Sequence, residues 1–234
     1  MKSRKTIELD IVSPELTGLI YSVHQQFDRL HNLCKFLEKA LSKETNRRRA
    51  EGKRQLKNTK NEDEKVFISA AIDDNLFEIE RDFPRIVRYS LFVSMMSTTE
   101  ASLVRLCRIA RSRLGITREL KEKTPGIIEH SINYLRNEAG LDTSKMHYYK
   151  ELADDLRNLR NTIAHSDGCI KGRKDEGAIR TFVNQGTGVE IDNRNNIVLS
   201  DRFVTNSAHG MRKLIIQLHG KLKNRIGAHI AKQG

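Results

Sequence analysis

The feature that most constrains the fold is the spacing of large apolar residues near the N-terminus, which recur three and four positions apart. Directly before them, Ser13, Pro14 and Glu15 combine an N-cap residue, a first-turn proline and an acid that the helix dipole favours. The pattern predicts one long helix that begins at Ser13 and ends near Thr45. Its apolar positions are Leu16, Leu19, Ile20, Val23, Phe27, Leu30, Leu33, Leu37 and Leu41.

The same periodicity predicts further helices over residues 66–80, 86–114, 124–138, from 142 to about 166, and 201–230. Pro84 either starts a new helix or kinks a continuing one. Two short β-prone pieces, 189–191 and 197–199, flank the turn sequence "DNRNN" and predict a β-hairpin. The 234 residues hold only 3 prolines and 14 glycines, too few for a sandwich of many strands. We therefore predict an all-α bundle, one domain over 1–234, with a small β-hairpin before the C-terminal helix.

Residues 46–65 stand apart from these periodic segments. Their sequence, "NRRRAEGKRQLKNTKNEDEK", contains one large apolar residue, Leu56. Such a segment buries too little apolar surface to offset the entropy lost on ordering. We expect a mobile or solvated basic connection here.

Charge and cysteine usage narrow the class of protein. The net charge of +12 favours polyanionic partners, either nucleic acid or an anionic membrane surface. No stretch is apolar enough for a secretory leader or a transmembrane helix, since the longest uncharged run is 89–99. The 3 cysteines show no Cys-x-x-Cys spacing, which argues against disulfides and zinc knuckles and for the cytoplasm. Tryptophan is absent and aromatic residues are 6%, which gives little support to an extended base-stacking platform.

The segment "LRNLRNTIAHSDG", residues 156–168, carries the most specific chemistry. An apolar stripe on one face of its helix leaves Asn161 and His165 on the opposite face, four residues apart, so that the amide can orient the imidazole. Arg160 lies beside the stripe, and a half-buried guanidinium needs an anionic or carbonyl partner. His165 stands in the final turn before the stop at Gly168, where the helix dipole favours a protonated ring. An arginine five positions before a histidine is expected about once by chance, so the context carries the interpretation.

Glu100 is the predicted partner of Arg160. It is the only charged residue between Arg88 and Arg105, in a helix that otherwise has a core-like sequence. A carboxylate in such a helix is rarely left unpaired. The alternative is that Glu100 faces solvent.

The "RNTIAH" segment resembles the Arg-polar-x-x-x-His signature of the HEPN superfamily, all-helical domains of which many are ribonucleases. The resemblance extends to the apolar helix "YSLFVSMMSTTEASLVRL" before it and to the hairpin and terminal helix after it. It implies that Arg160 and His165 are the catalytic pair, that Asn161 assists them, and that two copies form a homodimer whose motifs line one cleft. It also implies a toxin–antitoxin or phage-defence setting, with an antitoxin or defence protein as partner.

The residue types suit RNA cleavage without a metal or another cofactor. Histidine transfers protons near neutral pH, and the arginine fork matches a phosphate whose charge builds during attack by the 2′-hydroxyl. DNA would not be a substrate, because it lacks that hydroxyl. Five residues correspond to about 140° around a helix and about 7.5 Å along it, so one regular helix points the pair apart. Either the helix unwinds before His165, or a second copy completes the site.

Other polar groups receive weaker interpretations. Lys171, Arg173 and Lys174 in "KGRK", and Arg105 and Arg108 in a basic helix stripe, would contact neighbouring RNA phosphates, or they are ordinary solvated charges. A metal site at His24, Asp28 and His31 lacks a fourth ligand, and we predict none there.

Two other functions remain open at this point. One is a catalytically inactive HEPN module that binds nucleic acid or a partner protein as an adaptor. The other is a basic helical RNA-binding protein without the HEPN fold.

Overall fold

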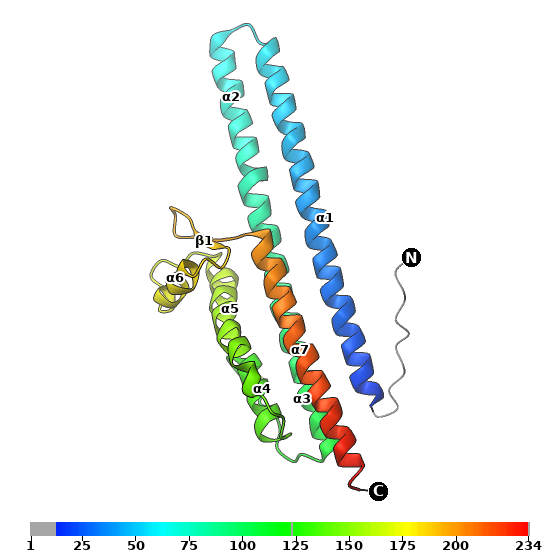
Figure 1. Ribbon diagram of the computed structural model, residues 1–234. Helices are drawn as coiled ribbons and strands as arrows, with labels where there is room; N and C mark the ends of the chain where they lie inside the picture. The colour runs from blue at the N-terminus through cyan, green and yellow to red at the C-terminus, as the bar shows by residue number, and fades with distance from the viewer. Residues whose placement is uncertain (1–12, 123, 234) are drawn as a thin grey trace, which may run out of the picture.

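The computed structural model describes residues 13–122 and 124–233, and it is an all-α bundle with one β-hairpin before the C-terminal helix (Figure 1). The fold class predicted from the sequence is confirmed. The N-terminal residues 1–12, in which we expected no secretory leader, lie outside the described part. The elements are α1 (Pro14–Asn58), α2 (Glu62–Phe77), α3 (Phe83–Leu114), α4 (Ile127–Asn137), α5 (His147–Ser166), α6 (Glu176–Asn184), β1 (Val189–Ile191), β2 (Ile197–Leu199) and α7 (Asp201–Ile230).

Helix α3 lies at the centre of the bundle. It packs against α1 and α7 on one side and against α4 and α5 on the other (Figure 1). The nearly uncharged first half of α3 forms the middle of the core, as its sequence predicts, because no charge there has to be desolvated. Fully buried side chains along α3 include Phe92, Met95, Met96, Leu103 and Leu106.

The structure differs from the expectation for residues 46–65, which are helical apart from the turn at 59–61. Helix α1 continues to Asn58 and forms a long hairpin with α2, which extends beyond the body of the molecule (Figure 1). Ion pairs one turn apart support α1 here, such as Arg47 with Glu51 at 2.8 Å. Contacts with α2 add to them, because Gly52 is buried against Ile72. The expected end of the helix near Thr45 is therefore wrong.

The helical backbone continues through Pro84, so the proline does not start a separate helix. Phe77, Asp82 and Phe83 all keep right-handed helical backbone angles, and a π-helical segment, Glu78–Asp82, joins α2 to α3. The wider turn accommodates the residues around the proline, which cannot donate a backbone hydrogen bond.

The β-hairpin has the predicted boundaries. Its antiparallel register pairs Val189 with Leu199 and Ile191 with Ile197, and Ser200 then caps α7. Helix α6 precedes the hairpin and was not predicted, since it is 9 residues long and buries only Ile179 and Phe182. Among the described residues, no helix is long and apolar enough to cross a membrane.

Candidate functional site: the end of α5 and its surroundings

Helix α5 remains regular through His165 and ends one residue later, at Ser166. Asp167 and Gly168 then take the left-handed conformation, with φ values of 46° and 83°. The Gly168 amide donates to the Thr162 carbonyl at 3.2 Å, which satisfies one of the last carbonyls of the helix. The expected stop is confirmed. Unwinding before His165, one of the two ways to bring the pair together, does not occur.

Contacts with α3 and β2 fix the end of α5. A Cβ atom built on Gly168 would lie 2.1 Å from the Tyr89 hydroxyl oxygen, so only glycine fits there. That hydroxyl donates to the Ile197 carbonyl, and the Ile197 amide donates to the Gly168 carbonyl at 2.9 Å. The turn after His165 is thereby attached to two other elements of the fold.

Arg160 forms the predicted ion pair with Glu100. Its Nη2 donates to Glu100 Oε1 at 3.0 Å, with side chains that are 29% and 24% exposed. Arg160 Nε is buried and has no hydrogen-bond partner within the described residues. The guanidinium is thus held by one carboxylate and keeps donors in reserve.

His165 is exposed and forms no hydrogen bond or ion pair with any residue that the structure describes. Asn161 is half-buried, yet no hydrogen bond joins its amide to the His165 ring in the described chain. The expected orientation of the imidazole by Asn161 is therefore not observed. A free imidazole at a helix C-terminus is available to a ligand from solvent.

A single chain does not bring Arg160 and His165 together. Arg160 turns inward to Glu100 on α3, whereas His165 faces solvent further along the same regular helix. This agrees with the separation of about 140° and about 7.5 Å that five helical residues impose.

The basic loop after α5 contains two exposed lysines and one engaged arginine. Arg173 donates to both Asp175 oxygens, at 2.9 and 3.0 Å, and to Ser166 Oγ at 2.9 Å. The hydrogen bonds from Arg173 hold the pKa of Asp175 below its usual value, although partial burial opposes them. Lys171 and Lys174 are exposed. The loop therefore places positive charge beside the residue that follows His165.

Arg105 and Arg108 do not belong to this neighbourhood. Arg85, at the other end of α3, is the residue that contacts Asp167, with 3.4 Å between Arg85 Nη1 and Asp167 Oδ2. Arg105 lies 20 residues further along α3, which is about 30 Å at 1.5 Å per residue. Arg105 is exposed, and Arg108 forms an ion pair with Glu122. The structure does not bring them to the α5 motif.

His24 and Asp28, considered above as metal ligands, both contact Arg212 of α7. Arg212 Nη1 donates to Asp28 Oδ1 at 2.7 Å, and Arg212 Nη2 contacts His24 Nδ1. Burial, followed by the positive charge of Arg212, lowers the pKa of His24. The described residues contain no group of three or more His, Cys, Asp or Glu side chains that could hold a metal ion.

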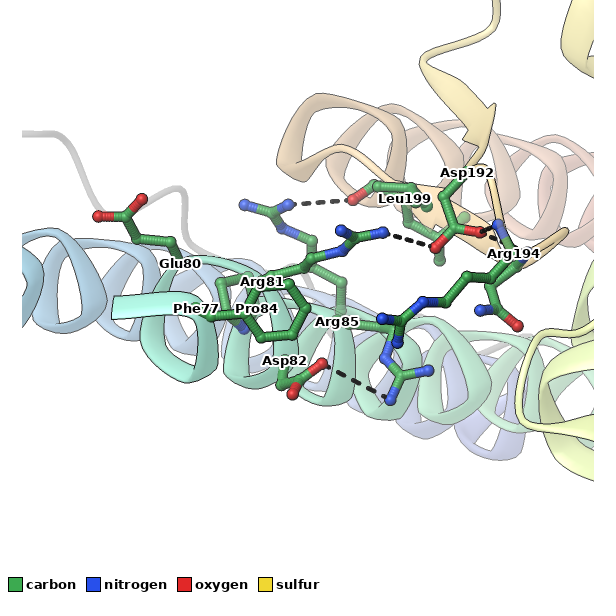
Figure 2. Close-up of a pocket in the computed structure, with 12 residues that line it drawn as sticks. Phe77, Glu80, Arg81, Asp82, Pro84, Arg85, Asp192, Arg194 and Leu199 are labelled. Carbon is green, nitrogen blue, oxygen red and sulfur yellow. Dashed lines mark hydrogen bonds and ion pairs between the residues drawn. The ribbon is translucent and has the colours of Figure 1, made fainter. Parts of the chain in front are cut away.

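A cluster of arginines that was not predicted from the sequence lies next to the motif. Arg81, Arg85 and Arg88 lie four and three residues apart, in "RDFPRIVR", and Arg194 reaches them from the hairpin turn. They line a hollow of about 140 Å³ between the start of α3 and the β-hairpin (Figure 2). The helical spacing of Arg81, Arg85 and Arg88 is visible in the sequence. The position of the hairpin turn next to them could not be predicted from it.

Comparison of the chain with protein-family models, with curated proteins and with solved structures finds no match.

Proposed function

We propose that this protein is a metal-independent endoribonuclease of the HEPN type that acts as a homodimer in the cytoplasm. The observation that carries the proposal is the state of His165, an exposed imidazole without a hydrogen-bond partner in the described structure, in the last turn of α5. The same helix holds Arg160, which Glu100 anchors at 3.0 Å.

In the proposed reaction, the 2′-oxygen of the RNA attacks the adjacent phosphorus and forms a 2′,3′-cyclic phosphate. The bond to the 5′-oxygen breaks, this oxygen takes a proton from His165, and the proton of the 2′-hydroxyl passes to water. Arg160 stabilises the negative charge on the phosphoryl oxygens. Histidine assistance of this kind contributes roughly 10²- to 10⁴-fold to the rate.

The geometry of α5 supports a dimer as the active unit. Because the helix is regular through His165, Arg160 and His165 of one chain do not converge. Under a two-fold axis, Arg160 of one copy would meet His165 of the other in each of two equivalent sites. Lys171 and Lys174, in the loop after α5, would then contact phosphates that flank the scissile bond.

The direct test is incubation of the purified protein with RNA in EDTA. We expect cleavage that leaves a cyclic phosphate, no cleavage of DNA of the same sequence, and a loss of at least about 100-fold in His165→Ala and Arg160→Ala. His209→Ala removes another exposed histidine, on α7, and is the matched control with unchanged activity. Equal cleavage by His165→Ala and the unaltered protein would contradict the proposal.

By resemblance to HEPN proteins, the setting we propose is a toxin–antitoxin or phage-defence system. Expression in a bacterial host would then arrest growth, and His165→Ala would relieve the arrest. The antitoxin or defence partner would be the protein that restrains this activity.

Two observations favour a second function, that of an inactive adaptor. The Arg160–Glu100 ion pair also fits a purely structural role for the arginine. In addition, α2 buries no residue and carries Val66 and Phe67, which are 70% and 83% exposed, as a surface suited to a partner protein. An adaptor would cut no RNA, and neither Arg160→Ala nor His165→Ala would change its binding.

A further inference from the structure

The hollow between the start of α3 and the β-hairpin has the size of a phosphate site. At about 140 Å³ it is smaller than the pockets that hold whole small molecules, which are roughly 300–1,000 Å³. Four arginines and three carboxylates line it, so the lining carries an excess of one positive charge. They are Arg81, Arg85, Arg88, Arg194, Glu80, Asp82 and Asp192.

Two of the carboxylates have close cationic partners, and the third, Asp82, makes a longer contact of 3.9 Å with Arg85. Glu80 pairs with Arg49 of α1 at 2.7 Å. Asp192 accepts from Arg81 Nη2 at 2.8 Å and also from the backbone amides of Arg194 and Asn196 (Figure 2). Burial alone would raise the pKa of Asp192, but these hydrogen bonds hold it below the usual value. Neither carboxylate is therefore left to neutralise the remaining arginines.

Arg88 is also satisfied. Its guanidinium donates to both oxygens of Glu38, at 2.7 and 2.9 Å, and to the Leu199 carbonyl at 3.1 Å. This paired arrangement connects α1, α3 and β2. Arg88 thus forms part of the wall of the hollow and is not available for a new ligand.

Arg85 and Arg194 are the two lining arginines without a close carboxylate partner, whereas Asp192 holds Arg81 at 2.8 Å. Arg85 lies 3.9 Å from Asp82 and 3.4 Å from Asp167, and its Nε is buried without a partner in the described chain. The Arg194 side chain forms no hydrogen bond or ion pair with a described residue. Figure 2 shows the two side chains reaching toward one another. Two guanidinium groups that share a hollow without a bridging carboxylate favour binding of an anion.

The surroundings of this pair identify the kind of anion. Arg85 contacts Asp167, which lies two residues after His165, so the hollow adjoins the end of α5. Phe77 lines the hollow and is 41% exposed; the Arg81 guanidinium lies over one face of its ring, 5.2 Å from the centroid, so a nucleobase would stack on the other face. An aromatic face beside a phosphate-sized basic hollow suits a nucleotide in a chain better than a free anion.

We propose that Arg85 and Arg194 bind a phosphodiester of single-stranded RNA, with the adjacent base stacked on Phe77. The assignment rests on the proposed ribonuclease function in one respect: the bound phosphate would be a neighbour of the scissile phosphodiester. The arginine fork supplies paired donors to the phosphate oxygens.

The test measures binding of a fluorescent single-stranded RNA whose 2′-O-methyl groups prevent cleavage, by anisotropy over a range of salt concentrations. In Arg194→Ala we expect binding weakened about fivefold or more, and a salt dependence whose log–log slope falls by about 0.7, as for the loss of one phosphate contact. Phe77→Ala would weaken binding about tenfold with an unchanged slope, because stacking involves no counterion release.

Arg54→Ala is the matched control, since it removes one exposed arginine from the far end of α1, away from the hollow. We expect this variant to bind within about twofold of the unaltered protein. Equal losses in Arg54→Ala and Arg194→Ala would show a diffuse charge effect and overturn the proposal. Arg194 is exposed in a turn, and a thermal unfolding curve that matches the unaltered protein confirms that Arg194→Ala is folded.

Two further outcomes are informative. One distinguishes RNA from free phosphate as the ligand, and the other distinguishes this binding site from the proposed ribonuclease function. Displacement of the probe by low-millimolar inorganic phosphate would reveal a free-phosphate site and overturn the RNA assignment. Because the probe cannot be cut, a binding loss in Arg194→Ala supports the site even if the protein proves to have no nuclease activity. Unchanged binding in Arg194→Ala, alongside cleavage that depends on His165, would reject this site alone.

Discussion

Gly168 is the residue on which the geometry of the α5 terminus depends most directly. It combines a φ of 83° with an approach to Tyr89 that leaves no room for a Cβ atom. Through Tyr89 and Ile197, this one glycine fixes the position of Asp167 and the turn that follows His165.

We predict that Gly168→Ala destabilises the protein by about 3 kcal/mol, from the left-handed conformation and from the clash with Tyr89. Gly172 is the matched control, because its φ is 75° and no atom lies within 4 Å of a Cβ built on it. Gly172→Ala should cost only about 1 kcal/mol, the conformational part. Urea denaturation measures both free energies of unfolding, and equal losses would contradict the role of the Tyr89 contact.

At the scale of elements, polar contacts between helices connect segments that are distant in the sequence. Arg212 of α7 holds His24 and Asp28 of α1, and Arg88 of α3 holds Glu38 of α1. These contacts set the relative positions of α1, α3 and α7, whose apolar faces alone would tolerate some sliding.

The contact between His24 and Arg212 predicts a pH dependence of stability. Because burial and Arg212 lower the pKa of His24, the unfolded chain takes up a proton at about pH 6.5 that the folded protein resists. The free energy of unfolding should therefore decrease as the pH falls from about 7.5 to about 5. His24→Gln should reduce this decrease, as urea denaturation at several pH values would show. The control is His209→Gln on α7, and an unaltered slope in His24→Gln would refute the assignment.

At the scale of the whole molecule, the proposed active site requires two copies of the chain. One chain separates Arg160, which turns inward to Glu100, from His165, which is exposed to solvent. Activity should then depend on dimerisation. Each composite site should need only Arg160 from one chain and His165 from the other.

Mixing inactive variants tests this composite site. Arg160→Ala and His165→Ala would each be inactive alone, but a mixed dimer contains one site with both functional groups intact. Random exchange of equal amounts should restore about a quarter of the unaltered activity, because half of the dimers are mixed and each has one intact site of two. The measurement is RNA cleavage in EDTA after subunit exchange. No recovery in dimers shown to be mixed would place the pair within one chain.

Local patterns in the sequence were sufficient for much of this structure. The apolar periodicity identified the main helices, and the alternation around "DNRNN" gave the β-hairpin its correct boundaries. The Arg160–Glu100 pair was predictable because a half-buried guanidinium needs an anion and the facing helix offers one carboxylate. These features depend on local properties of each segment, namely its apolar periodicity, its turn residues and its half-buried charges.

Other features depend on tertiary contacts between segments that are distant in the sequence. Residues 46–58 are helical in spite of their low apolar content, since α2 packs along them and ion pairs support them. The arginine hollow exists because the hairpin turn lies over the start of α3, so that Arg81 meets Asp192 across 111 positions of sequence. Asn161 and His165 have the right spacing for a hydrogen bond, but in the structure the His165 ring is exposed to solvent and the two side chains are not hydrogen-bonded. The sequence alone shows which side chains require a polar or apolar partner. Which residue becomes that partner depends on how segments distant in the sequence pack together.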